Sequence, residues 1–212
     1  MHRTHLAVAL VLAASVPLSG CGPKKSPTRA TTQPNPQPAV MTDVTARMSE
    51  LQRRARELAE VGRQLPGRNP QEDRQLVVSA FERSSAALQL LGGPEPGGAF
   101  RQQLRIIDNT RQQIQSAADG APADASVDTG LRSVYNALVS VRERLFPNEP
   151  NVQQQLDAVR DRLADLDEVR GPLHSLVVSQ VFSRTAQVVD TMAGELEGRN
   201  AAAAAHAQQP PQ

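Results

Sequence analysis

Hydrophobic residues recur at spacings of three and four along most of the chain between residues 41 and 198. In the first segment they fall at Met41, Val44, Met48, Leu51, Ala55, Leu58, Gly62 and Leu65. Such spacing is typical of an α-helix with one buried stripe, because side chains three or four residues apart share a face. Proline and glycine clusters interrupt the pattern at PGRNP (66–70), GGPEPGG (92–98), FPNEP (146–150) and Gly171-Pro172. The pattern therefore predicts an all-α protein of about six helices.

Five further segments carry stripes of the same kind. The stripe residues are Val77, Phe81, Ser84, Leu88 and Leu91; Phe100, Leu104, Ile107, Ile114 and Ala118, with Arg111 intruding; Val127, Leu131, Val134, Leu138, Val141 and Leu145; Val152, Leu156, Val159, Leu163 and Leu166; and Val177, Val178, Val181, Phe182, Val188, Val189, Met192 and Leu196. The valine-rich stretches LVVS (76–79) and LVVSQVF (176–182) could also be read as strands. Because the helical spacing continues beyond strand length and no alternation is present, helices are favoured.

Two helix ends carry recognisable sequence features. Asn69, Pro70 and Glu72 stand where an N-cap, the first helical residue and the third helical residue of a capping box are expected. Gly171 suits the left-handed position that closes a helix, here the fifth. These features predict a helix that begins at Pro70 and another that ends near Gly171.

Short connections between the segments predict antiparallel neighbours, and hence an elongated antiparallel helical bundle over residues 41 to 198. One merged bundle and two tandem three-helix bundles both fit this expectation. The tetrapeptide LVVS recurs at an interval of 100 residues, and ELQRRARELAEV (50–61) resembles QLDAVRDRLADL (155–166). These similarities fit a duplicated hairpin, in which the first two helices and the last two are copies, but segments with a heptad pattern also resemble one another for packing reasons alone.

Composition excludes several functional classes. Aromatic residues make up 2% of the chain, so aliphatic side chains must build the core and few stacking platforms for bases or sugars exist. The single cysteine, Cys21, cannot form an internal disulfide or a thiolate metal cluster. With 23 basic and 22 acidic residues, the chain lacks the basic excess of a nucleic-acid binder, and no nucleic-acid partner is expected.

The N-terminal residues have the pattern of an export signal. A short basic start, MHRTH, precedes the eleven-residue apolar run LAVALVLAASV (6–16). Eleven residues are too few to span a hydrocarbon layer of about 30 Å as a helix, but they fit the apolar part of a signal peptide. We therefore expect residues 1–20 to be removed.

The end of this segment, Leu18-Ser19-Gly20-Cys21, resembles the lipobox of bacterial lipoproteins. The resemblance covers about residues 1–22 and implies cleavage before Cys21, a diacylglycerol thioether on its sulfur and acylation of its amine. An ordinary secretory signal with an incidental cysteine is the alternative. Gly22 differs from the aspartate that retains enteric lipoproteins in the inner membrane, which favours the periplasmic face of the outer membrane.

The segments on either side of the predicted helices are poor in large hydrophobic residues. Residues 21–40 carry five prolines and several Thr, Ser and Gln residues, which predicts a semi-extended tether after the lipidated cysteine. Residues 199–212 begin as an alanine-rich extension of the last helix and end in a predicted disordered tail.

The search for chemistry returns weak candidates. His174 and Met192, or Met48, could serve as axial ligands of a haem inside the bundle, although a structural histidine and packed methionines are the simpler interpretation. His206 falls in the tail. The acidic residues Asp161, Asp165, Asp167 and Glu168 alternate with arginines, which indicates a solvated face of ion pairs rather than a metal site.

Sequence motifs of known enzyme classes, such as a P-loop, HExxH or GxSxG, are missing from the chain. We therefore expect a protein without catalytic, cofactor-binding or metal-binding residues. The sequence predicts a lipid-anchored envelope protein that contacts an unknown protein partner as a scaffold, spacer or accessory subunit. A homo-oligomer is a further possibility, and a carrier of haem or another small molecule near His174 is the alternative function.

Overall fold

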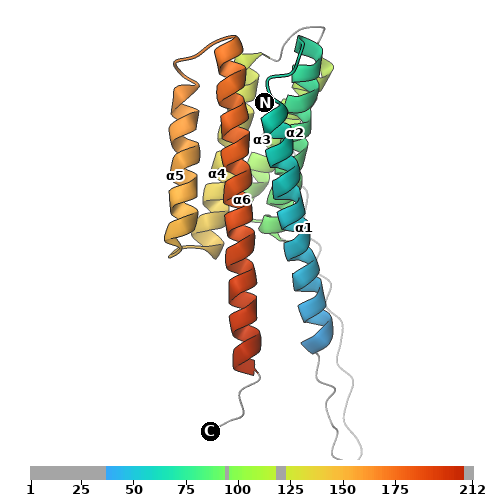
Figure 1. Cartoon of the computed structure of the whole chain (residues 1–212), viewed down its shortest axis with the longest axis vertical. Coiled ribbons are helices and arrows are strands. Elements are labelled where there is room, and N and C mark those ends of the chain that lie inside the picture. Colours follow the sequence, from blue (N-terminus) through green and yellow to red (C-terminus); the bar gives the residue numbers. More distant parts are fainter. Residues whose placement is uncertain (1–36, 94–95, 118–122, 208–212) are drawn as a thin grey trace, which may run out of the picture. The chain divides into compact units, whose positions relative to one another are not determined.

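The computed structural model describes residues 37–93, 96–117 and 123–207, with side chains from Asp43 onward. These residues form six helices and no strand, as the hydrophobic pattern predicts (Figure 1). The helices are α1 (Gln37–Gln64), α2 (Pro70–Gly92), α3 (Gly98–Ser116), α4 (Asp124–Leu145), α5 (Pro150–Asp165) and α6 (Pro172–Ala207). The predicted signal peptide, Cys21, tether residues up to 36 and the last five tail residues lie outside the described residues.

The helices form one merged bundle in which each helix packs against its neighbours in sequence. The ring closes because α1 and α6, the first and last helices, share the most extensive contact of all (Figure 1). The second, fourth and sixth helices also contact one another in pairs, so that α2, α4 and α6 form an inner triangle. The outer helices α1, α3 and α5 each lie between two inner ones. This arrangement excludes two separate tandem three-helix bundles.

The predicted stripes supply most of the core. The stripe residues of α2 and α5 are all buried, as are those of α4 except for the half-buried Leu145. At the centre, the rings of Phe81 and Phe182 meet edge to face with centroids 5.2 Å apart. Gly130 of α4 leaves room for this pair, since a Cβ there would lie 2.5 Å from the Phe81 ring. The inner triangle is therefore closed by aromatic packing against a glycine.

The first and last hairpins repeat the same packing, displaced by 101 residues. All ten buried positions of α2 have a buried counterpart in α6 at this displacement, for example Phe81 and Phe182. The outer helices obey the same relation, as Leu51 and Val152 illustrate. LVVS recurs at 100 residues instead and pairs buried Val77 with half-buried Val177. The tetrapeptide is thus one residue out of step with the packing repeat.

The predicted N-cap of α2 is confirmed, and it fixes the α1–α2 turn. Asn69 Oδ1 accepts a hydrogen bond of 2.9 Å from the backbone N–H of Glu72, and Pro70 is the first helical residue. Glu72 reaches back to the N–H of Arg68, one residue before the cap. Gly171 has the predicted left-handed backbone, with φ of 62°, but α5 ends earlier, at Asp165. Gly171 therefore shapes the entry into α6 rather than the end of α5.

Arginines from neighbouring helices bind the unpaired carbonyls at helix C-terminal ends. Arg144 donates to the carbonyls of Leu91 (3.2 Å) and Gly92 (2.8 Å) at the end of α2. Arg199 donates to the Leu145 carbonyl at the end of α4, at 2.7 Å, and lies over the Phe146 ring. The last carbonyls of a helix have no partner within it, and a positive charge there is favourable. These arginines fix how adjacent helices are aligned along their length.

Candidate functional site

The N-terminal ends of α2, α4 and α6 meet at one end of the bundle because these three inner helices run in the same direction. Two of their innermost side chains at this level are polar, Asp73 of α2 and His174 of α6, and they occupy equivalent positions of the 101-residue repeat. Negative charge is favourable at helix N-termini, which suits the aspartates gathered here. This end of the bundle is the main polar exception to an aliphatic interior.

His174 is 3% exposed and is held between two carboxylates of α4. Its Nε2 lies 2.7 Å from Asp128 Oδ1, which is a hydrogen bond. Its Nδ1 lies 3.4 Å from Asp124 Oδ1. A buried imidazole needs such partners, because an unpaired buried polar group is costly. His174 therefore ties the start of α6 to the start of α4, as expected for a structural histidine.

Asp73 of α2 likewise connects its helix to α6 and to the α1–α2 turn. It is 7% exposed, and its Oδ1 accepts a hydrogen bond from the Gly67 N–H at 3.1 Å. Its Oδ2 accepts from the Ser175 hydroxyl at 3.2 Å. A Cβ on Gly67 would lie 2.5 Å from the Asp73 nitrogen, so the turn passes too close for another residue type. The hydroxyl of Ser175 is thus engaged by a carboxylate and not by the neighbouring imidazole.

A cavity of about 370 Å³ opens beside these residues. Valines from all three inner helices line it (Val77, Val127 and Val178). Asp73, Asp124, His174, Ser175 and the α1–α2 turn supply its polar lining. Outside this lining, Leu173 and Leu176 in the first turns of α6 are 62% and 46% exposed. The cavity therefore combines aliphatic and acidic walls.

Within this cluster, Ser175 and His174 are not arranged as a nucleophile and its base. Ser175 donates to Asp73, while both nitrogens of His174 face aspartates of α4, so no hydroxyl is in position to be activated by the imidazole. Among the residues that the structure describes, no group of three or more His, Cys, Asp and Glu side chains is arranged to hold a metal ion. The contacts of this cluster are those of a clamp between helices.

The predicted haem ligands lie far apart. Met192 follows His174 by 18 residues on the same helix, which corresponds to about 27 Å along its axis. Met192 is fully buried among aliphatic residues, and Met48 of α1 is also in the core. His206 is exposed near the end of α6. His174 and Met192 therefore cannot ligate one haem iron together.

Of the four acidic residues near the end of α5, Asp161, Asp165 and Asp167 form ion pairs with arginines. Arg162 contacts Asp165 at 2.8 Å and Arg160 contacts Asp161 at 3.3 Å. Arg132 of α4 reaches Asp167 at 2.7 Å and joins the two helices. These pairs are exposed, and each contributes little to stability.

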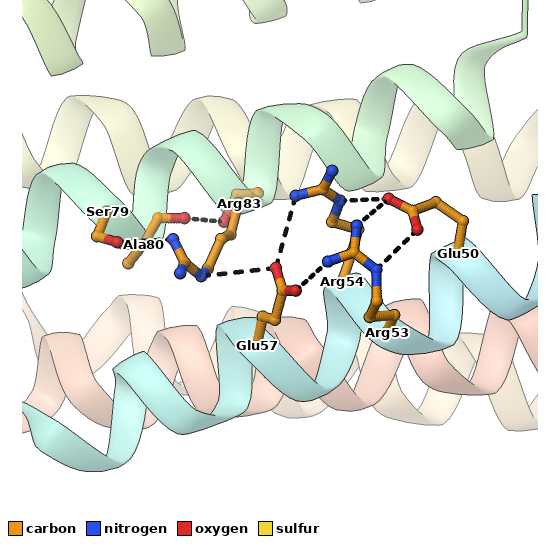
Figure 2. A network of polar contacts seen from close by, with 8 residues as sticks. Glu50, Arg53, Arg54, Glu57, Ser79, Ala80 and Arg83 are labelled. Carbon is orange, nitrogen blue, oxygen red and sulfur yellow. Dashed lines mark hydrogen bonds and ion pairs between the residues drawn. The ribbon is translucent and has the colours of Figure 1, made fainter.

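A second charged network covers the α1–α2 contact, and the sequence interpretation missed it. Arg53 and Arg54 each bind both Glu50 and Glu57 along α1, and Arg83 of α2 lies 3.8 Å from Glu57 (Figure 2). Hydrogen bonding from Arg53 lowers the pKa of Glu50, and the same contact raises the pKa of Arg53. The spacings of three and four between opposite charges could have predicted it.

The residues around His174 were also missed, apart from His174 itself. Asp73 lies four residues before Val77, so it continues the buried stripe of its helix with a polar side chain. Asp124 and Asp128 stand one turn apart on α4. A polar residue at a stripe position is a recognisable indication of a buried cluster, but the partners of such a residue come from other helices.

Comparison of the chain with models of protein families, with curated proteins and with solved structures finds no match. Within the described part of the chain, none of the helices has the length and apolar character needed to cross a membrane. Inferences about function therefore depend on the chain's own residues.

Proposed function

We propose that the protein is a lipid-anchored component of a bacterial cell envelope, favoured at the periplasmic face of the outer membrane. In this proposal it acts through protein contacts, as a scaffold, spacer or accessory subunit, and not by catalysis. The observation that carries the proposal is Leu18-Ser19-Gly20-Cys21 directly after the apolar run of residues 6–16. Two or three acyl chains on Cys21 would hold the protein durably, because each buried methylene contributes about 0.8 kcal/mol.

The helical bundle supports a role in contact rather than chemistry. The tether joins the bundle at the start of α1, and α1 runs about 40 Å from there to the α1–α2 turn. The helix α6 runs antiparallel to it, since Gln52 contacts Glu197 while Gly62 approaches Ser183. The His174 end of the bundle is therefore remote from the point where the tether enters, and a partner can reach it.

The test is a Cys21→Ser variant produced in cells beside the unaltered chain. We expect the unaltered protein to fractionate with membranes and to incorporate radiolabelled palmitate, and the variant to lose both properties because the acylated sulfur is gone. Membrane association and palmitate incorporation that persist in the variant would refute the anchor. Sedimentation of the purified mature protein separates a monomer from the homo-oligomer that the sequence leaves open.

A further inference from the structure

We infer that the outward face of α3 is a docking surface for an acidic protein segment, whose carboxylates bind the guanidinium groups of Arg101 and Arg105. The surface is a strip of four exposed residues, Arg101, Arg105, Asn109 and Gln112, which recur at spacings of three and four. At 1.5 Å per residue the strip is about 16 Å long. The inference names the chemistry of the partner, and it rests on the proposed function for the partner's being an envelope protein.

The strip lies opposite the buried face of α3 and is open to a partner. In the described part of the chain, α3 packs against α2 and α4 alone. Its inward face is used by these contacts, since Phe100 lies against Gly92 of α2 and Thr110 lies against Gly130 of α4. At about 100° per residue, Arg105 lies about 160° around the helix from the buried Ile107. Its side chain therefore points away from the bundle.

The two arginines of the strip have no carboxylate to bind within the described residues. The helix holds one carboxylate, Asp108, which is half-buried and accepts a hydrogen bond from the Ser85 hydroxyl of α2 at 3.5 Å. Arg101 and Arg105 lie one turn apart, and like charges at this spacing destabilise a helix. A carboxylate from another molecule would relieve the repulsion between them.

The other two outer helices differ, because they neutralise most of their outward arginines themselves. In α1, Arg53 binds Glu57 four residues later, and in α5, Arg162 binds Asp165 three residues later at 2.8 Å. In α3 the residue four places after Arg105 is Asn109, a carboxamide. The exposed residues of α3 include arginines and carboxamides but no carboxylate. The outward charge of α3 is thus left for an external partner.

The composition of the strip favours protein carboxylates over an anionic lipid surface. Attraction to such a surface depends on a cluster of about four to eight basic residues, and the strip holds two. A guanidinium binds a carboxylate through two parallel N–H donors, and this geometry makes arginine selective for that group. A helical segment with Asp or Glu at every fourth residue would match the spacing of Arg101 and Arg105.

Cross-linking in intact cells tests the surface in the full-length chain. A photoreactive amino acid is placed at Asn109 or Gln112 and, as a matched control, at Gln180, an exposed carboxamide of α6. We expect an adduct to one protein from the two α3 positions that is at least five-fold weaker from Gln180, with Asp or Glu repeated in the cross-linked segment. An adduct to a lipid or glycan, to a second copy of this chain or to a segment without acidic residues would overturn the inference, as would equal adducts or none.

Defined peptides test the chemistry on the purified mature protein. The probes are an alanine-rich helical peptide with glutamate at every fourth position and its counterpart with glutamine, followed by NMR of the arginine Nε–H groups. We expect the glutamate peptide to shift the signals of Arg101 and Arg105. Arg105→Gln should weaken its binding by about five-fold, the size of one exposed ion pair. Arg56→Gln is the matched control, because Arg56 of α1 is also exposed and without an ion-pair partner among the described residues.

The outcomes separate this inference from the anchor. Equal binding of the two peptides, or an equal loss in Arg105→Gln and Arg56→Gln, would overturn the docking surface whatever Cys21 carries. Since Arg105 makes no contact that the fold needs, the urea midpoint of Arg105→Gln should not fall, and weaker binding then reports on the surface itself. Loss of membrane association in the unaltered protein would refute the anchor and leave the peptide result standing.

Discussion

Each buried polar side chain in this bundle requires a partner, and most of them find one nearby. Ser84 and Ser133 donate to the carbonyls four residues earlier in their own helices, at 2.8 and 2.9 Å. His174 and Asp73 instead use side chains and backbone of other elements. Thr185 differs, because its hydroxyl is fully buried and has no partner among the described residues. A hydroxyl buried in this way lowers stability.

Thr185→Val should therefore raise the free energy of unfolding by about 1 kcal/mol, since the methyl that replaces the hydroxyl needs no hydrogen bond. Urea denaturation of the purified protein measures the change. Ser84→Ala is the matched control, because it removes a hydroxyl that has an acceptor at the equivalent position of α2 and should give no gain. A loss of stability in Thr185→Val would show that its hydroxyl has a partner in solution.

At the scale of the helix, glycines mark where two elements approach closely. A Cβ on Gly130 would lie 2.5 Å from the Phe81 ring and 2.9 Å from the Thr110 methyl, in the middle of the bundle. A Cβ on Gly194 of α6 would meet nothing within 4 Å. Both glycines are helical, so alanine is favoured at each by helix propensity alone. The surroundings of each glycine therefore decide whether its replacement by alanine raises or lowers the free energy of unfolding.

Gly130→Ala should lower the free energy of unfolding by about 1 to 3 kcal/mol, because the added methyl forces the Phe81 ring out of its packing with Phe182. Gly194→Ala should raise it by about 0.5 to 1 kcal/mol through reduced backbone entropy in the unfolded chain. Thermal unfolding followed by circular dichroism compares the two variants. If the free energy of unfolding changed in the same direction in both variants, the close packing around Gly130 would be contradicted.

The sequence predicted the elements well because helix formation depends on local spacing. Stripe residues such as Val134 and Leu156 are buried as expected, and proline and glycine clusters mark the turns. The start of α1 was placed at residue 41, whereas the helix begins at Gln37, because proline is tolerated in a first turn. The partners of His174 were not predictable, because they come from α4, 46 residues earlier in the chain for Asp128.

For the whole molecule, closure of the ring by α1 and α6 is the deciding feature. In two tandem three-helix bundles, the two halves would touch only through helices that are consecutive in the sequence. Here the first helix packs against the last. The inner triangle of α2, α4 and α6 joins all three hairpins at the centre. A fold connected in this way has no obvious line along which it could unfold in parts.

Unfolding should accordingly be a single cooperative transition. Tyr135 is the only tyrosine in a chain without tryptophan, and it packs against the core from α4, so its fluorescence reports on the second half of the bundle. We expect the urea midpoint of the Tyr135 fluorescence change to coincide with the midpoint of the helical circular dichroism signal, which reports on all helices. Two separated midpoints would indicate two independent halves.

The sequence by itself determined that the chain is helical, where its turns fall and that its core is aliphatic, because these properties follow from spacing and composition within each segment. It also carries the lipobox, which predicts an anchor that lies outside the described residues. Only the tertiary structure decided between one bundle and two, and placed Asp73, Asp124 and His174 around one cavity. Contacts between distant helices depend on how their faces pack together, and local spacing does not specify which faces meet.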